Sequence, residues 1–251
     1  MNTAKARKRR GTVTKKILHC TGTFVLLNMP VPKSVDLYHS VEYITRIFNT
    51  MKDVKVTYFD MEGTAEAIRW LLAYGGQEFE DVRVGFADWP ALKPKTPHGV
   101  MPLLEFDGKV YGQSFAICRY LGKKFGLGGK TLEEDLVIDQ NTDFYADVRL
   151  KGIQSFWEPD ASIKAVKQEA LVKTVYPELL PKLDKIIREN NGHMALGRLT
   201  WADFVFAGFY EYFKQQSLIP DIDEKYPSFK KLRETVSSLP AIKKYLESKT
   251  K

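Results

Sequence analysis

A tyrosine at the end of a predicted strand is the first side chain that could do chemistry. In the run VKVTYF, residues 54–59, Val54, Val56 and Tyr58 take alternate positions, which is the period-two pattern of a half-buried strand. Gly63 follows in the next loop. The phenol either fills a core or donates a hydrogen bond to a ligand beyond the strand, and the strand alone favours the core.

Two further positions could bind anions. Trp89 and Lys93 lie in the proline-rich run DWPALKPKTP, where an ammonium group suits a carboxylate and an indole N–H supplies a donor. Gln113 and Ser114 stand where a predicted helix begins, and free N–H groups at a helix start favour an anion. Each has a common structural alternative: a surface lysine, a tryptophan packed under its loop, and an ordinary serine cap.

Four aspartates recur every fourth residue in a predicted helix, namely Asp135, Asp139, Asp143 and Asp147. Like charges at this spacing cost a few tenths of a kcal/mol per pair. Either the stripe is a solvated acidic face, or positive groups of another subunit lie opposite it. Both interpretations stay open on spacing alone.

The net charge of +7 is concentrated at the start of the chain. Residues 1–50 carry nine Lys or Arg against two acidic residues, so the remaining residues are neutral overall. Nucleic-acid binding needs a basic face on the folded body, so we predict no nucleic-acid partner. Residues 1–51 are predicted to form a basic extension, as a disordered arm, an unusual start of the coding region or a targeting segment.

Cysteine and hydropathy patterns point to an intracellular protein without a membrane span. Cys20 and Cys118 make no disulfide framework, which suits a reducing compartment, and Cys118 in the run FAIC is expected to be buried. There is no run of 18 apolar residues. We expect a cytoplasmic protein, with organellar targeting by residues 1–50 as the alternative.

The elements that must position these residues change character near Gly129. Before it, strand and helix signals alternate, and Asp107-Gly108 between two short strands is a strong hairpin signal. After it, only helical periods occur, and Thr200 and Asp203 have capping-box spacing. The expected order before Gly129 is strand 54–59, helix 65–76, strand 79–84, hairpin 102–111 and helix 114–127.

The motifs Tyr58, DWPALKPKTP, GVMPLLEFDG and QSFAICRYL, in this order, closely resemble the cytosolic glutathione transferases. Among these, the chain is most similar to the sigma class, which includes insect detoxification enzymes and glutathione-dependent prostaglandin D isomerases. The resemblance covers residues 54–248. It implies a thioredoxin-like domain over 52–129, an all-helical domain over 130–251, and a homodimer.

The resemblance also implies a glutathione site. It places a cis peptide bond at Met101-Pro102, where an edge strand opened by proline is the alternative, and sets Asp147 against the glutathione of the partner subunit. It puts the helix of the aspartate stripe at the dimer interface, with Arg119 facing Asp139 or Asp143. The implied glutathione-binding residues are Tyr58, Trp89, Lys93, Val100, Met101, Pro102, Gln113, Ser114 and Asp147.

In this family context Tyr58 has a defined chemical task. A free thiol has a pKa of about 8.5, and the thiolate is the nucleophile. A phenol that donates to the sulfur stabilises the anion by ~1.5–3 kcal/mol, which lowers the thiol pKa by about one to two units. Tyr58 is therefore predicted to be a hydrogen-bond donor that stays protonated.

The electrophile pocket departs from the prostaglandin isomerases. Many sigma members have arginine where this chain has Thr64, the isomerase has an aromatic residue near Gln154, and Ala146 interrupts its metal-responsive acidic cluster. We therefore predict no metal and a transferase acting on apolar electrophiles, with an isomerase or peroxidase, or a non-catalytic crystallin-like relative, as alternatives. By family position the pocket residues are Phe59, Met61, Gly63, Thr64, Arg149 and Gln154.

Overall fold

The computed structural model describes residues 50–249, so the predicted basic extension lies outside it except for its last two residues. Met51, which the prediction placed in the extension, is 3% exposed. Its backbone N–H donates to the Gln77 side chain at 3.1 Å, and its carbonyl accepts from the same side chain at 3.2 Å. The folded unit therefore begins no later than Met51.

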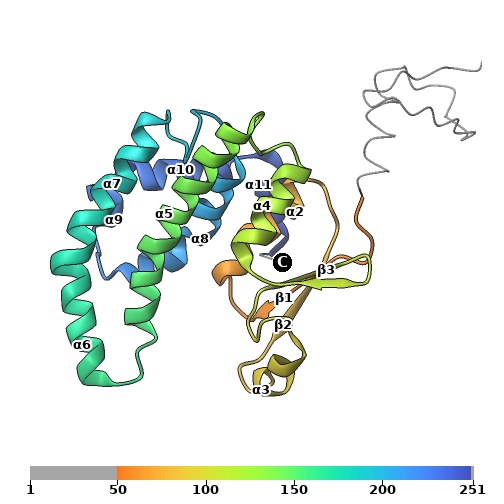
Figure 1. The fold of residues 1–251 in the computed structure, drawn as a ribbon, viewed down its shortest axis with the longest axis horizontal. Helices are drawn as coiled ribbons and strands as arrows, with labels where there is room; N and C mark the ends of the chain where they lie inside the picture. The colour runs from red at the N-terminus through yellow and green to blue at the C-terminus, as the bar shows by residue number, and fades with distance from the viewer. Residues whose placement is uncertain (1–49, 250–251) are drawn as a thin grey trace, which may run out of the picture. The chain divides into compact units, whose positions relative to one another are not determined.

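A four-stranded mixed sheet forms the first part of this unit, in the order β2-β1-β3-β4 (Figure 1). β1 is parallel to β2 and antiparallel to β3, and β3 is antiparallel to β4. Along β1 burial alternates as the sequence predicts, because Val56 and Tyr58 turn to the helix-covered core while the residues between them are half-buried. The strands are β1 (Lys55–Phe59), β2 (Glu80–Val84), β3 (Leu103–Phe106) and β4 (Lys109–Tyr111).

Short and long helices connect these strands. A 3₁₀ turn, η1 (Gly63–Ala65), and α2 (Glu66–Tyr74) follow β1, and α4 (Ser114–Lys124) follows β4. Between β2 and β3 the proline-rich segment, expected to be a loop, forms two short helical turns, because Pro90 and Pro94 occupy first-turn positions where no N–H is needed. These turns are α3 (Trp89–Leu92) and η2 (Lys93–Lys95).

The second part is entirely helical, as the sequence predicted. Its longest element is α5, followed by a helix pair joined through a π-helical segment and by the central helix α8. The run from 228 to 248, helical in period, is divided because Pro240 begins a new helix. The helices are α5 (Leu132–Phe156), α6 (Ala161–Ala170), η3 (Leu171–Val175), α7 (Tyr176–Glu189), α8 (Trp201–Ser217), α9 (Ile222–Lys225), α10 (Pro227–Ser237) and α11 (Pro240–Lys249).

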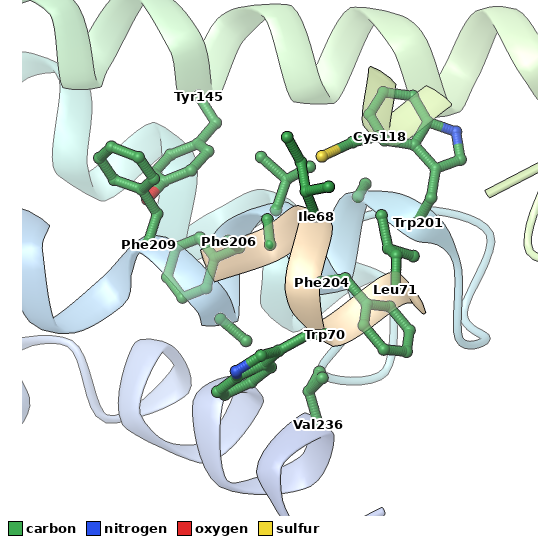
Figure 2. Close-up of a cluster of buried hydrophobic side chains, with 14 of the residues drawn as sticks. Ile68, Trp70, Leu71, Cys118, Tyr145, Trp201, Phe204, Phe206, Phe209 and Val236 are labelled. Atoms are coloured by element: carbon green, nitrogen blue, oxygen red, sulfur yellow. The ribbon is translucent and has the colours of Figure 1, made fainter. Parts of the chain in front are cut away.

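Helix α8 packs against helices of both parts, namely α2 and α4 of the first and α5 and α10 of the second. Its buried side chains pack against α2, and Figure 2 shows Phe204 and Phe206 beside Trp70 of α2. A Cβ added at Gly208 would lie 2.8 Å from the backbone nitrogen of Ala67, so only glycine permits this close helix approach. The two parts of residues 50–249 therefore share a continuous core.

Several local predictions are confirmed. Asp107 and Gly108 both have positive φ, 49° and 72°, as a tight hairpin turn requires. The Asp203 carboxylate accepts from the Thr200 backbone N–H at 2.6 Å, which completes the predicted capping box. Cys118 is 1% exposed, and burial raises the pKa of its thiol above the ordinary value. None of the helices in residues 50–249 has the length and apolar character needed to cross a bilayer.

Candidate active site

Tyr58 is held at the carboxyl end of β1 by the loop that follows it. The side chain is 8% exposed, and the chain turns back at once, with the Met61 N–H donating to the Phe59 carbonyl at 2.7 Å. A Cβ added at Gly63 would lie 2.6 Å from Tyr58 Cε1 and 2.8 Å from its hydroxyl oxygen, and Gly63 has φ +43°. Residues 60–63, called the 60–63 loop below, can therefore lie against the phenol because position 63 carries no side chain.

The backbone at Met101 and Gln113 is unusual in two ways. The Met101-Pro102 bond is cis, as the resemblance implied, and Pro102 is buried just before β3. Gln113 has φ 72°, a rare conformation for a residue other than glycine. It precedes Ser114 at the start of α4, and no side chain caps this helix, so its first N–H groups remain available to a ligand. A residue other than glycine held at a positive φ, as Gln113 is, is often found at binding sites.

The proline-rich turns bring Trp89 and Lys93 toward the same end of the sheet. Trp89 is half-buried, with its ring edge-on to Phe59 at 5.7 Å between centroids. Lys93 is exposed and its Cε lies above Gly99, where an added Cβ would be 3.6 Å away. Val100 beside it is 40% exposed. The ammonium group of Lys93 is therefore open to an anion from solvent, while Trp89 has a packing role as well.

On the side of the site that the helices form, Arg149 is a buried charged residue. It lies on α5, is 9% exposed, and stacks over the rings of Phe209 at 4.2 Å and Phe115 at 5.1 Å. Its Nε and Nη1 have no hydrogen-bond partner among the residues described. Burial lowers the pKa of Arg149, while the phenols of Tyr145 and Tyr58 act in the opposite direction. A buried guanidinium with free donors thus lies near Tyr58, and buried donors without partners are costly unless a ligand or water satisfies them.

Other predicted pocket residues are distributed unevenly. Thr64, Ser114, Phe115 and Phe209 line one small cavity, so η1, α4 and α8 do converge. Gln154 is exposed and does not line this cavity. Phe59 points to the other face of β1 from Tyr58, and stacks on Phe86 at 4.5 Å. Met61 is half-buried in the 60–63 loop.

Three aromatic residues of α4 and α8 form a wall of the site on the side of Arg149, and the sequence did not identify them as site residues. They are Phe115, Phe209 and Tyr212. Burial raises the pKa of Tyr212, whose phenol also interacts with Tyr58 and Arg149, and its hydroxyl accepts from Trp157 Nε1 at 3.1 Å. In the sequence these rings are part of helical apolar runs and look like ordinary core residues. Only their position opposite β1 distinguishes them.

The aspartate stripe on α5 has partners within its own chain. Asp135 pairs with Lys123 at 2.8 Å, and Arg119 pairs with Asp139 at 2.8 Å and Asp143 at 3.8 Å. The pairing of Arg119 with this stripe is therefore correct, although it joins α4 to α5 of one subunit. Asp147 is exposed and has no ion pair within residues 50–249. In that range, no group of three or more His, Cys, Asp or Glu side chains could hold a metal ion.

Comparison with known proteins agrees with this arrangement. The family model described as Glutathione S-transferase, N-terminal domain, matches residues 54–123, and the model for the C-terminal domain matches residues 146–249. Glutathione S-transferase 2 of Manduca sexta is 53% identical over 201 residues, which are 80% of this chain and 98% of that protein. The chain belongs to the glutathione S-transferase family.

Proteins named for prostaglandin synthesis are also similar to this glutathione S-transferase. Hematopoietic prostaglandin D synthase of Gallus gallus is 34% identical over 203 residues, covering 80% of this chain and 98% of that protein. The structure of prostaglandin synthase D of Nilaparvata lugens is 40% identical and superimposes with a TM-score of 0.73 over 78% of this chain and 97% of that one. The thioredoxin-like fold and the helical domain are thus shared with both groups.

Proposed function

We propose that this glutathione S-transferase uses Tyr58 to hold glutathione as a thiolate that adds to an electrophilic carbon. The observation that supports this most is the close packing of Gly63 on Tyr58, where an added Cβ would lie 2.8 Å from the hydroxyl oxygen. An uncapped helix start at Ser114 and two partnerless donors of Arg149 add to it. The hydroxyl donates to the sulfur, and the proton released by the thiol leaves to solvent. When the new C–S bond forms, the leaving group departs or a proton adds to the electrophile.

Glutathione fits the backbone features on the other side of Tyr58. The N–H groups at Ser114 suit the γ-glutamyl carboxylate, and the backbone of Met101 beside the cis proline can pair with the cysteinyl part as an added strand does. Lys93 and Trp89 suit the glycyl carboxylate. Gln113 and Val100 complete this proposed set, together with Asp147 of the second subunit.

Arg149 refines the proposed electrophile. A purely apolar molecule would leave its Nε and Nη1 donors without a partner, whereas a carbonyl or similar oxygen would accept from them. Phe209 and Phe115 provide the apolar surface beside it. We therefore favour α,β-unsaturated aldehydes and ketones, in which the oxygen lies at one end of an apolar chain. Met61, Thr64, Phe59 and Gln154 remain predicted contributors to this pocket.

Prostaglandin isomerisation is the second candidate, since two relatives are named for it. The same thiolate would add to one oxygen of the endoperoxide as the O–O bond breaks and the other oxygen takes up a proton. Loss of a proton from the carbon that bears the S–O group would then form the ketone and release the thiolate. We also propose the sigma class, a homodimer and a cytoplasmic location, without a nucleic-acid partner or metal.

Two assays on the purified chain test the activity. Glutathione with an unsaturated aldehyde should give the conjugate, and prostaglandin H2 with glutathione should give prostaglandin D2 only if the second candidate applies. Absence of any conjugate from aldehydes and aryl chlorides, together with no prostaglandin D2 from prostaglandin H2, would favour a crystallin-like role and overturn the proposal. Formation of prostaglandin D2 without any conjugate would replace the first candidate by the second.

A further inference from the structure

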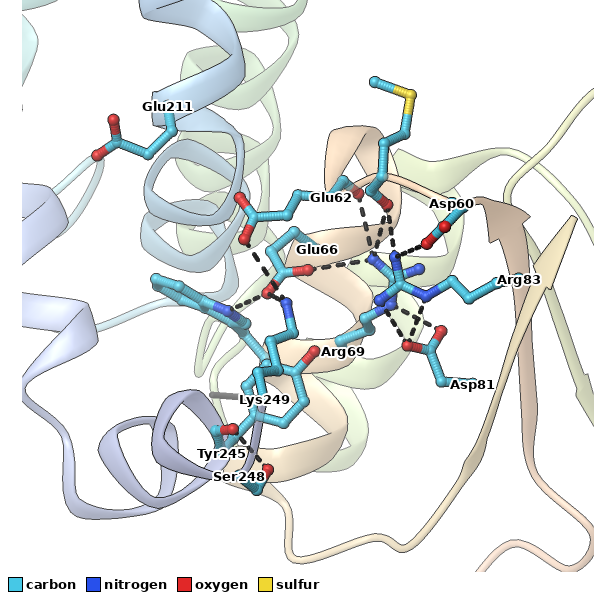
Figure 3. A network of polar contacts seen from close by, with 12 residues as sticks. Asp60, Glu62, Glu66, Arg69, Asp81, Arg83, Glu211, Tyr245, Ser248 and Lys249 are labelled. Atoms are coloured by element: carbon cyan, nitrogen blue, oxygen red, sulfur yellow. Dashed lines mark hydrogen bonds and ion pairs between the residues drawn. The ribbon is translucent and has the colours of Figure 1, made fainter. Parts of the chain in front are cut away.

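A buried carboxylate lies next to the 60–63 loop, at the first residue of α2. Glu66 is 1% exposed, and its carboxylate accepts from Trp70 Nε1 at 2.8 Å, from Arg69 Nη1 at 3.1 Å and from Lys249 Nζ at 2.5 Å (Figure 3). A charge withdrawn from water is costly unless it is paired and fully hydrogen-bonded. Glu66 is therefore balanced by one cation from its own helix and by one from the last residue of α11.

Arg69 connects this carboxylate to the loop. It is 0% exposed, and its Nη1 also donates to the carbonyls of Glu62 at 3.2 Å and Met61 at 3.4 Å. Its Nε donates to Asp81 at 2.9 Å. One guanidinium thus bridges Glu66, the backbone of the 60–63 loop and strand β2.

A second guanidinium holds the same backbone from β2. Arg83 Nη1 donates to the Met61 carbonyl at 2.9 Å, and its Nε and Nη2 bind Asp81 at 2.9 and 2.6 Å. Asp60 lies 3.9 Å from Arg83. Two carbonyls of a four-residue loop are therefore fixed by arginines that share Asp81 as a common partner.

The loop passes this restraint directly to Tyr58. Gly63 follows Glu62, and its Cα faces the phenol so closely that an added Cβ would touch the hydroxyl oxygen at 2.8 Å. A shift of the Glu62 carbonyl by a few tenths of an ångström would therefore change the packing of that hydroxyl. Positioning errors of this size are enough to weaken a hydrogen bond to a reacting atom.

We propose that Lys249, acting through Glu66 and Arg69, is a positioning residue for the Tyr58 hydroxyl. It reaches Glu66 from 183 residues away in the sequence. Without its charge, Glu66 would draw Arg69 more strongly, at the expense of the hydrogen bonds that Arg69 makes to the 60–63 loop. The inference rests on the proposed function, because it assumes that Tyr58 activates the glutathione thiol.

The groups around Lys249 are consistent with this role. Glu62 lies 3.7 Å from Lys249 Nζ, so the lysine also contacts the loop itself. Tyr245 packs under the lysine with its ring 4.9 Å from Nζ, and burial, with Glu66 adding to it, raises the pKa of this phenol. Arg233 stacks on Trp70 at 4.9 Å and lies 3.8 Å from Glu211. Lys249 is thus the charged group that α11 contributes to the cluster.

The test is the variant Lys249→Met, which keeps an unbranched side chain as far as the ε position and removes the charged amine. The ionisation of bound glutathione is followed by the ultraviolet absorbance of the thiolate as pH is raised, and kcat and the KM for glutathione are measured at pH 6.5. We expect the thiol pKa to rise by about half a unit to one unit and kcat to fall about three- to tenfold. The KM should change less than twofold, because the proposed contacts with the peptide lie elsewhere.

Two matched variants control for general effects. Lys244→Met lies on the exposed face of the same helix and should behave as the wild type. Lys249→Arg keeps the charge and should retain most of the wild-type activity.

Arg83→Lys is a second test of the restraint on the 60–63 loop. It keeps the positive charge but loses the guanidinium fork that reaches Met61 and Asp81, so the thiol pKa should rise as it does in Lys249→Met.

Distinct results would overturn the inference. If Lys249→Met lowers the melting temperature but leaves the thiol pKa and kcat unchanged, the lysine is only structural and the proposal is wrong. The proposal is equally wrong if Lys244→Met has the same effect as Lys249→Met. If Tyr58→Phe also leaves the thiol pKa unchanged, the proposed function fails instead, because no positioning of that hydroxyl would matter.

Discussion

The two sides of the site are built from different parts of the polypeptide. On the side of the sheet, the backbone provides the special features: a cis peptide at Met101-Pro102, a positive φ at Gln113 and the bare Cα of Gly63. On the side of the helices, side chains provide them, with Arg149 on α5 and Phe209 on α8. Regular helices hold those side chains without any backbone irregularity at those positions.

The two sides of the site should differ in the substitutions that they tolerate. A backbone with a positive φ at Gln113 and a bare Cα packed against a ring at Gly63 tolerates few substitutions, which suits a co-substrate that is always the same. Side chains on rigid helices can be exchanged while the scaffold stays intact. We therefore expect substitutions on the sheet side to reduce all conjugation and substitutions on the helix side to change the choice of electrophile.

The largest effect should come from Tyr58→Phe. Loss of a hydrogen bond to a charged sulfur, worth ~1.5–3 kcal/mol, predicts a fall in kcat/KM of about ten- to more than a hundredfold with every electrophile. The same loss should raise the thiol pKa by about one to two units, so activity should partly recover at alkaline pH. A pH profile identical to that of the wild type would remove Tyr58 from the mechanism.

The next largest effect should come from Gly63→Ala. The new Cβ would lie 2.6 Å from Tyr58 Cε1, and alanine at φ +43° is strained by about 1–2 kcal/mol. We expect kcat to fall about tenfold with all electrophiles and the melting temperature to fall by a few degrees. Gly126→Ala is the matched control, because Gly126 also has a positive φ but open space around an added Cβ, so its activity should stay that of the wild type. Full activity in Gly63→Ala would show that the phenol has more room than the structure gives it.

A smaller and selective effect is expected for Arg149→Met. Methionine fills the space between Phe115 and Phe209 but offers no donor. Activity toward an unsaturated aldehyde should fall about tenfold, which corresponds to one charged hydrogen bond, whereas activity toward benzyl chloride should change less than threefold. Equal losses for both substrates would show that Arg149 acts on glutathione and not on the electrophile.

The smallest effect should come from Asp147→Ala. An exposed ion pair contributes about 0.2–1 kcal/mol, so the KM for glutathione should rise by no more than about fivefold while kcat stays constant. The oligomeric state, measured by light scattering, should not change. Asp143→Ala is the matched control, because Asp143 already has Arg119 as a neighbour. A KM that is equally raised in both variants would indicate a general effect of acidic charge.

Much of the fold was predictable because its signals are local. Alternation along β1, the Asp107-Gly108 turn and the Thr200–Asp203 capping box each depend on neighbours within a few residues. The division of the chain into a mixed sheet and a helical part follows from hydrophobic periods alone. The short turns at Trp89 were not predicted, because elements of three or four residues are too short to show a helical period. The π-helical segment before α7 was not predicted either, because it differs from an α-helix only in the spacing of its hydrogen bonds.

The site was predictable only where family motifs marked it. Tyr58 and the cis proline could be named from the sequence, but the wall formed by Phe115, Phe209 and Tyr212 could not. Partnerless donors cannot be identified in a sequence either. Family position named Arg149 as a pocket residue, but its burial and its partnerless donors become visible only when α5 packs against α8.

Periodicity and turn chemistry in the sequence predicted most strands and helices, and they set Tyr58 at the end of a strand. The burial of Arg149 near this phenol, and the charge cluster that Lys249 completes, became visible only in the folded structure. Sequence patterns of this kind act over a few residues. Contacts between distant residues arise only when a shared apolar core brings their elements together.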